Sequence, residues 1–287
     1  MDFVAIDVET ANADLASICA VGIVGFDTGR ASSCWHSVID PEDEFAPIST
    51  WIHGIDAARV KGAPKFSQVF DHLSSLLANQ IVVSHTAFDR VSIARASAKY
   101  GIPIVDWQWL DTACVARRAW KQFSRSGYGL ANLAEWCGIS FEHHRADEDA
   151  RAAGEVLLRA VSDTGISVSD WLGRVRQPIG SSIRKPSASI TREGNAEGPL
   201  SGEVVAFTGA LSIPRREAAD LAATAGCNVV ASPTKKTTLL VVGDQDVRKL
   251  AGHEKSSKHR KAEALIEKGQ QLRILRESDF VRMVQID

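Results

Sequence analysis

Short apolar segments bounded by polar residues predict a series of strands in the first half of the chain. Apolar runs at Phe3–Ile6 and Ser17–Phe26, and around Trp35–Ile39, are typical of strands that are largely buried. Two more strands are expected at Ile81–Val83 and Trp107–Leu110.

Apolar residues at helical spacing predict helices between and after these strands. The expected helices span 66–77, which Asn79 closes, and then 88–99, 111–121, 130–137 and 146–162. Strands that come first, followed by strands that alternate with helices, indicate a mixed α/β fold.

The last third of the chain shows a second, shorter series of elements. The expected order is strand, helix, strand, strand, helix, strand and helix, at Val204–Phe207, 215–225, Asn228–Ala231, Leu239–Val242, 257–268, Leu272–Leu275 and 278–285. This βαββαβα order predicts a small parallel sheet flanked by helices.

A segment with little to bury separates the two series. Residues 176–199 contain three prolines, three glycines and four serines, which predicts a flexible linker. The 287 residues also favour two domains, at roughly 150 residues per domain. We therefore expect one domain over 1–175 and a second over 200–287.

Composition excludes several classes of protein. Hydrophobic residues make up 45% and charged residues 24%, so collagen-like, fully disordered and disulfide-scaffold proteins are excluded. The five cysteines are scattered without a C-x-x-C pair, which favours a reducing, cytoplasmic location. The start of the chain lacks a basic signal-peptide region, and the longest nearly apolar run, Ala16–Phe26, is shorter than the roughly 20 residues of a spanning helix. No membrane partner is expected.

Charge differs between the two halves. Residues 1–173 contain 14 Lys and Arg against 22 Asp and Glu, whereas residues 200–287 contain 14 against 11. The acidic first part favours a carboxylate-rich site for metal ions, and the mildly basic second part favours contacts with phosphate. Charged runs are also common on ordinary solvated surfaces, so neither inference stands alone.

Carboxylates follow the first expected strand and recur twice later in the chain. Asp7 and Glu9 point to the same side of an extended chain, at the mouth of a buried strand. Asp89 follows another buried strand, and His144 precedes a helix that carries Asp149. Taken singly, these residues are more typical of a solvated strand end, a surface histidine and acids at helix N-termini.

The ordered set resembles the DEDDh 3′–5′ exonucleases, the family of the proofreading epsilon subunit of bacterial DNA polymerase III. The D-x-E-T motif matches Asp7–Thr10, the F-D motif matches Phe88-Asp89, and the H-x-A-x-x-D motif matches His144–Asp149. Trp51–Ile55 is similar to the family's I-H-G-I segment, and Asp111-Thr112 fits a D-T spacer. The resemblance covers roughly residues 2–162 and implies an RNase H-like mixed-sheet domain.

The resemblance also implies roles for individual residues. Asp7, Glu9, Asp89 and Asp149 would hold two divalent ions, Mg²⁺ or Mn²⁺, around a scissile phosphate. His144 would be the general base, and substrate contacts would come from Thr10, His53, Gly54 and Phe88. The neighbouring His143 competes for the role of base, but the motif spacing selects His144. Asp147 and Glu148 are expected to face solvent.

One residue departs from the family pattern. The second motif usually reads H-N-A-x-F-D, whereas this chain has His85 where the family has asparagine. The carboxylate of Asp89 is retained, so metal binding is expected to survive. The motif alone does not indicate how His85 affects binding of the substrate nucleotide.

Residues 200–287 resemble a BRCT domain of the kind found in NAD-dependent DNA ligases and in the large subunit of replication factor C. The matching stretches are Val205–Leu211, Lys235–Gly243, Ser257–Ala262 and Asp279-Phe280, while Asp244–Ser256 is longer than usual. Members that bind DNA ends hold a phosphate with residues that correspond to Thr208, Gly209, Arg215 and Lys258. The alternative to a phosphate site is that Thr208-Gly209 is only a turn and that Arg215 and Lys258 are ordinary surface charges.

Together these resemblances predict a metal-dependent 3′–5′ exonuclease that releases nucleoside 5′-monophosphates from DNA in repair or proofreading. The BRCT module is expected to bind 5′-phosphorylated DNA ends or a phosphoprotein, with replication or repair proteins as partners. Two alternatives remain open, an RNA-trimming 3′–5′ exoribonuclease and a non-catalytic adaptor that binds nucleic acid. The four carboxylates and His144 argue against the adaptor.

Overall fold

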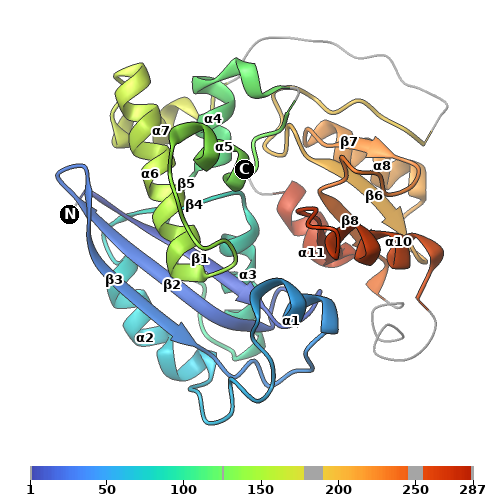
Figure 1. Cartoon of the computed structure of the whole chain (residues 1–287), viewed down its shortest axis with the longest axis horizontal. Helices are drawn as coiled ribbons and strands as arrows, with labels where there is room; N and C mark the ends of the chain where they lie inside the picture. The colour runs from blue at the N-terminus through green and yellow to red at the C-terminus, as the bar shows by residue number, and fades with distance from the viewer. Residues whose placement is uncertain (1, 125, 178–189, 245–254, 286–287) are drawn as a thin grey trace. The chain divides into compact units, whose positions relative to one another are not determined.

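The computed structural model describes residues 2–124, 126–177, 190–244 and 255–285 (Figure 1). The chain divides into two compact units, Met1–Gln177 and Pro178–Asp287. None of the described helices is both long and apolar enough to cross a membrane.

The first unit is built on a five-stranded mixed sheet. Its strands are β1 (Phe3–Thr10), β2 (Ile18–Asp27), β3 (Arg30–Val38), β4 (Ile81–Ser84) and β5 (Gln108–Asp111), in the order β3-β2-β1-β4-β5. The first three strands form an antiparallel meander, and β4 and β5 add to β1 in parallel. The mixed α/β fold expected from the sequence is confirmed.

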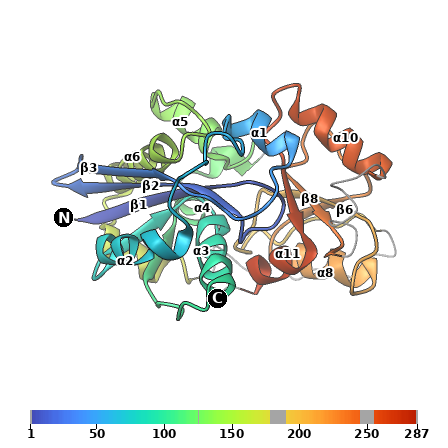
Figure 2. The ribbon, with the colours of Figure 1, turned by 90° about the horizontal axis from the view of Figure 1, so that it is seen from below.

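Helices cover both faces of this sheet, as Figure 2 shows. The helix α6 (Ala146–Thr164) crosses β1 and β2 on one face, and α4 (Thr112–Ala119) and α5 (Leu130–Cys137) pack against it. On the other face lie α2 (Phe66–Leu77) and α3 (Phe88–Lys99). Burial of both faces explains why the central strands read as continuous apolar runs.

Three short elements were not expected from the sequence. They are α1 (Pro47–His53), the 3₁₀ helix η1 (Lys121–Ser124) and α7 (Val168–Arg174). Proline at the first turn of α1 is compatible with a helix start, because its missing N–H would have no intrahelical acceptor. At about two turns or less, such helices give too little periodicity to be recognised from sequence.

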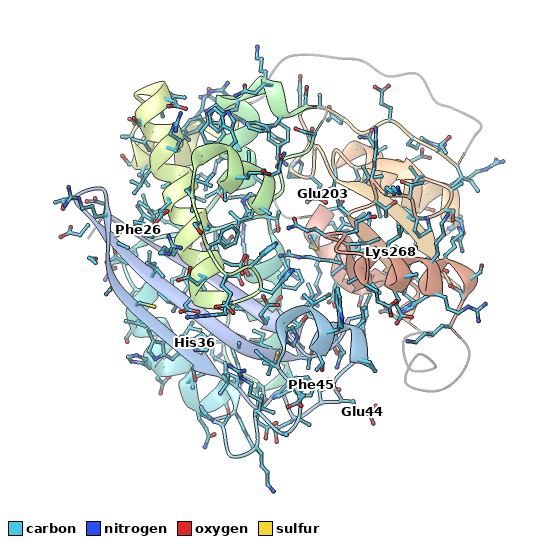
Figure 3. All side chains as sticks on the ribbon, viewed as in Figure 1. Phe26, His36, Glu44, Phe45, Glu203 and Lys268 are labelled. Atoms are coloured by element: carbon cyan, nitrogen blue, oxygen red, sulfur yellow. The ribbon has the colours of Figure 1, made fainter. Side chains whose placement is uncertain are left out.

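The contact between α6 and the sheet relies on glycine. A Cβ built at Gly154 of α6 would lie 2.2 Å from the ring of Phe26, which is labelled in Figure 3. Phe26 is fully buried and stacks on Phe3, with ring centroids 4.7 Å apart. The helix therefore approaches the sheet more closely than any larger residue at position 154 would permit.

The second unit is a four-stranded parallel sheet in the order β7-β6-β8-β9. In chain order its elements are β6 (Val204–Thr208), α8 (Arg215–Thr224), β7 (Asn228–Val230), β8 (Leu239–Val242), α10 (Ser257–Ile266), β9 (Arg273–Arg276) and α11 (Glu277–Val284). The βαββαβα order predicted from the sequence is confirmed.

The segment before β6 packs more closely than its composition indicates. Residues 190–199 fall in the expected linker, yet Arg192 exchanges two backbone hydrogen bonds with Val229 of β7. Gly194 and Gly198 lie against backbone atoms of residues 225–227, where a Cβ would clash. Glycine here permits close packing rather than flexibility. Residues 178–189 of the expected linker, and 245–254 of the long Asp244–Ser256 segment, lie outside the described residues.

Candidate active site

Two of the predicted carboxylates project from the C-terminal half of β1. Asp7 and Glu9 are two residues apart on one strand, so their side chains leave the sheet on the same face. Asp7 is only 8% exposed, and Glu9 is half-buried near the strand end. The apolar residues that precede them anchor this strand in the core.

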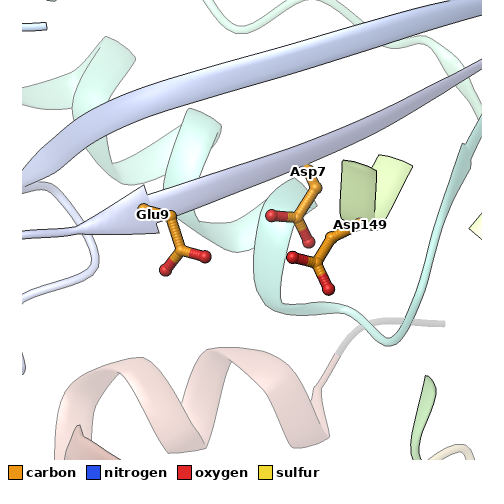
Figure 4. A group of neighbouring side chains, drawn as sticks. All are labelled: Asp7, Glu9 and Asp149. Carbon is orange, nitrogen blue, oxygen red and sulfur yellow. The ribbon is translucent and has the colours of Figure 1, made fainter. Parts of the chain in front are cut away.

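A third carboxylate reaches them from the first turns of α6. Asp149, Asp7 and Glu9 each offer an oxygen, and these three atoms all lie within 4.8 Å of one another (Figure 4). Gly22 makes this approach possible, because it faces Asp7 in the neighbouring strand and a Cβ there would lie 2.2 Å from the backbone nitrogen of Asp147. The start of α6 thus lies directly over β2.

The two carboxylate oxygens of Asp149 have different surroundings. Oδ1 is 2.7 Å from Nδ1 of His143, whereas Oδ2 is buried and has no hydrogen-bond partner among the described residues. A buried carboxylate oxygen beside two other carboxylates is unfavourable unless a cation or a proton neutralises it. This donor set of oxygens fits a hard divalent cation.

Asp89 lies beside this cluster and is held by the backbone of β1. Its Oδ1 accepts a hydrogen bond of 3.0 Å from the amide of Val8, the residue between Asp7 and Glu9. The side chain is fully buried in the first turn of α3. Asp89 is therefore close in space to the other predicted ligands, while the tight three-carboxylate group consists of Asp7, Glu9 and Asp149.

The two adjacent histidines lie next to the carboxylates. His144 Nδ1 is 3.9 Å from Oε1 of Glu9, and the His144 side chain is 34% exposed. Its ring stacks on that of His143, with centroids 4.0 Å apart and an interplanar angle of 12°. His144 thus combines proximity to the carboxylates with access to solvent.

The neighbouring acids of the third motif are paired elsewhere. Asp147 forms an ion pair of 2.7 Å with Arg145, and Glu148 forms one of 2.7 Å with Arg151. Neither carboxylate belongs to the three-carboxylate group. Both acids lie outside this group, but the expectation that Asp147 faces solvent is wrong, because its side chain is only 13% exposed beside Arg145.

His53 joins the I-H-G-I segment to the end of β1. Its Nε2 lies 3.2 Å from the carbonyl oxygen of Thr10, and its Nδ1 accepts a hydrogen bond of 3.1 Å from the amide of Ile55. Burial lowers the pKa of His53, and its bond to Thr10 only partly opposes that shift. Gly54 ends α1 in the left-handed conformation, with φ of 69°. Thr10, His53 and Gly54 are therefore brought together.

A small pocket of about 50 Å³ opens beside these residues. His53 and His144 both line it, together with His36 and Arg59. It connects the I-H-G-I segment to the third motif. Phe88, the remaining predicted substrate contact, is buried at the start of α3 next to Asp89.

His85 has a role within the protein that its sequence position did not reveal. It is buried, with Nε2 donating 2.9 Å to the carbonyl of Tyr128 and Nδ1 hydrogen-bonded at 2.8 Å to the hydroxyl of Thr112. It therefore ties the loop after β4 to the start of α4 and to the segment before α5. The histidine that replaces the family's asparagine therefore has a hydrogen-bond partner within the protein on each ring nitrogen.

The second unit gathers polar groups around the end of β6. Arg215 donates from Nη1 to the carbonyl of Phe207 at 2.6 Å and from Nη2 to the carbonyl of Gly209 at 2.7 Å. Lys258 Nζ donates to the same Phe207 carbonyl at 3.0 Å. Burial and the nearby Arg215 lower the pKa of Lys258, as expected for two cations held close together.

A serine completes this group. The hydroxyl of Thr208 is 2.6 Å from that of Ser256, which also caps α10 by accepting from the amide of His259. Ser256 was missed from the sequence, although a serine directly before a predicted helix is a recognisable N-cap signal. The four residues expected to bind phosphate, Thr208, Gly209, Arg215 and Lys258, are thus brought together with Ser256.

Two family models match this chain, one over each group of residues described above. The exonuclease family model (RNase_T) matches residues 4–157, which include every predicted ligand and His144. The chain belongs to this exonuclease family. The BRCT (BRCA1 C Terminus) domain model matches residues 195–282, so the exonuclease domain is followed by a BRCT domain.

A relative of known name is similar to about two thirds of this chain. DNA polymerase III PolC-type of Thermotoga petrophila is 29% identical over 192 residues, which are 64% of this chain and 14% of that protein. This chain therefore corresponds to a small part of that relative.

Solved structures share the fold of the exonuclease domain. Exonuclease X in complex with 5′ overhanging duplex DNA has a TM-score of 0.50 and 21% identity, over 60% of this chain and 99% of that one. A 3′-exonuclease that recognises histone mRNA stem-loop has a TM-score of 0.51 and 14% identity, over 56% of this chain and 82% of that one. The RNase H-like fold predicted for this exonuclease is confirmed.

Proposed function

We propose that the exonuclease domain removes nucleotides from DNA 3′ ends by metal-dependent hydrolysis and releases nucleoside 5′-monophosphates. The observation that carries this proposal is the group formed by Asp7, Glu9 and Asp149, with a buried and unpartnered oxygen on Asp149. Bound Mg²⁺ or Mn²⁺ would lower the pKa of an attacking water and stabilise the departing 3′-oxygen.

The side chains divide this work between them. Asp7, Glu9 and Asp149 hold the ions, and Asp89 assists from its position against β1. His144 accepts the proton of the attacking water, a role supported by its exposure and its place 3.9 Å from Glu9. Thr10, His53, Gly54 and Phe88 hold the terminal nucleotide.

The substrate is proposed to be DNA because the matched relative is a DNA polymerase III. Similar folds occur in complexes with DNA and with mRNA, so the fold itself does not choose between the two polymers. Contacts to the 2′-hydroxyl of the substrate would determine whether DNA or RNA is preferred. Partners in replication or repair and a cytoplasmic location are part of the same proposal, the latter supported by the scattered cysteines.

Digestion of labelled nucleic acids tests this function directly. The full chain is incubated with 5′-labelled single-stranded DNA, duplex DNA and RNA of one sequence, with Mg²⁺, Mn²⁺ or EDTA. We expect DNA to shorten stepwise from the 3′ end with release of 5′-monophosphates, and only with metal. Faster loss of RNA would support exoribonuclease activity, and binding without cleavage would support the adaptor. Asp7→Asn is the inactive control.

We also propose that the BRCT domain binds a terminal phosphate. Two cations meet at one carbonyl, two hydroxyls lie beside them, and α8 and α10 begin there. A phosphate placed among these donors would relieve the repulsion between Arg215 and Lys258. The expected ligand is a 5′-phosphorylated DNA end.

Hairpins with and without a 5′-phosphate test this proposal on the full chain in EDTA. We expect Arg215→Ala or Lys258→Ala to weaken binding of the phosphorylated hairpin by roughly ten- to hundredfold, since each removes one charge-assisted bond. Arg216→Ala and Lys261→Ala, which remove exposed charges from the same two helices, are the matched controls. Equal affinity of the wild type for both hairpins would refute binding to DNA ends. Preference for a phosphopeptide would assign the same donors to a protein ligand.

A further inference from the structure

His143 contacts a predicted metal ligand directly. Its Nδ1 is 2.7 Å from Oδ1 of Asp149, and it must donate because an ionised carboxylate can only accept. This bond occupies one oxygen of Asp149 and leaves the buried Oδ2 for another ligand. The Asp149 side chain is 5% exposed, so there is little solvent to replace this donor.

The backbone near the histidines holds His143 in place. Side chains of neighbouring residues point to opposite sides of an extended chain. His144 instead has φ of 67°, in the left-handed region, and the two imidazoles stack in parallel. The ring of Phe141 contacts His143 with centroids 5.2 Å apart. His143 therefore contacts two rings while it donates to Asp149.

This placement addresses a physical problem of the site. Repulsion from Asp7 and Glu9 favours rotation of the Asp149 carboxylate away from them when no cation is bound. The hydrogen bond from His143 to Oδ1 opposes that rotation and holds the Asp149 carboxylate beside Asp7 and Glu9. Hydrogen-bond partners of metal-bound carboxylates commonly change metal affinity by about 10–100-fold when they are removed.

We propose that His143 is a positioning residue that orients Asp149 for metal binding. The inference rests on the proposed metal-dependent activity, because Asp149 is a metal ligand only in that proposal. The proposal also gives the two histidines different roles, since His143 donates to Asp149 while His144 accepts a proton. His143, considered from the sequence only as a rival base, thereby acts through a ligand instead.

Two substitutions separate the hydrogen bond from the aromatic ring. His143→Phe retains a ring that can contact Phe141 and stack on His144, but it loses the donor. His143→Asn loses the ring, yet its side-chain amide can place a donor near the position of Nδ1. His72→Phe is the matched control, because His72 lies on α2 with its ring 5.1 Å from that of Trp35.

Calorimetric titration of the full chain with Mn²⁺, without nucleic acid, provides the first measurement. We expect His143→Phe to weaken Mn²⁺ binding by about 10–100-fold, and His143→Asn and His72→Phe to stay within about threefold of the wild type. Wild-type affinity in His143→Phe would overturn the inference. Equal weakening of Mn²⁺ binding in His143→Phe and His143→Asn would also overturn it, since the lost donor would then not explain the change in affinity.

The Mn²⁺ dependence of DNA cleavage provides the second measurement. For His143→Phe we expect the Mn²⁺ concentration of half-maximal rate to rise by about 10–100-fold, while the rate at saturating Mn²⁺ stays within about threefold. A lower saturating rate at an unchanged half-maximal concentration would contradict positioning. If the wild type binds Mn²⁺ without cleaving DNA, the proposed function fails while the calorimetric comparison still decides the role of His143.

Discussion

Gly22 faces Asp7 across the β1–β2 ladder, and the space beside its Cα is occupied by the backbone of Ala146 and Asp147. The residue opposite one carboxylate thereby determines how closely the helix that carries Asp149 can approach. The geometry of the three-carboxylate group depends on the absence of a side chain as much as on the acids themselves.

Gly22→Ala should disturb the carboxylates and the fold together. The new Cβ would lie 2.2–2.5 Å from backbone atoms, which cannot rotate away as a side chain could. We expect a loss of about 1–3 kcal/mol in the free energy of unfolding, as for other overpacked sites, and weaker Mn²⁺ binding. Denaturant unfolding and calorimetry provide the two measurements.

Gly154→Ala is the control for this change. Its Cβ would meet the Phe26 ring at 2.2 Å, within the same helix–sheet contact but away from the carboxylates. It should lower stability while Mn²⁺ affinity stays near the wild-type value. A similar loss of affinity in both variants would mean that Gly22 acts only through global stability.

Neutralising one carboxylate should abolish cleavage and stabilise the metal-free protein. Asp7→Asn and Asp149→Asn each remove a negative charge from a group of three oxygens within 4.8 Å. We expect activity to fall by orders of magnitude, and the melting temperature in EDTA to rise by about 2–4 °C if ~1 kcal/mol of repulsion is relieved. Unchanged cleavage by either variant would refute its assignment as a ligand.

Replacing His144 should slow the reaction without preventing metal binding. His144→Asn is the suitable variant, because asparagine tolerates the left-handed backbone observed at this position. We expect kcat to fall by about 10²–10⁴-fold, the usual contribution of a general base, with Mn²⁺ affinity nearly unchanged. Single-turnover cleavage and calorimetry distinguish this result from a loss of metal.

Acidification should destabilise the exonuclease domain through His53. Its pKa in the folded protein is lowered from 6.5 by burial, so the unfolded chain binds a proton more readily. The free energy of unfolding should therefore be insensitive to this group above pH 6.5 and decrease as the pH falls below it. Denaturant titrations between pH 7.5 and 5 measure this effect.

His53→Gln should reduce that dependence on pH, because glutamine does not titrate. His72→Gln is the matched control, since His72 lies on the exposed face of α2. An unchanged pH profile in His53→Gln would show that other groups dominate acid destabilisation.

Local patterns were sufficient to predict most of the fold and the order of the motifs. Alternation along β1 places Asp7 and Glu9 on one side, and apolar runs mark the buried strands of both sheets. The strand β3 begins at Arg30, before the expected Trp35, because its first residues are polar and exposed and so give no apolar pattern. The contact between His143 and Asp149 could not be predicted, because it depends on the left-handed backbone at His144. Likewise, the roles of Gly22 and Ser256 depend on residues far away in the sequence.

The bond between Asp89 and the Val8 amide determines which inactive variant is best suited to capture natural substrates from cells. Removing the Asp89 side chain would leave that amide without its acceptor, in the middle of the strand that carries Asp7 and Glu9. Asp149→Asn removes charge from α6 and leaves the hydrogen bonds of β1 intact. Asp149→Asn is therefore the better trap for recovering and sequencing bound DNA or RNA.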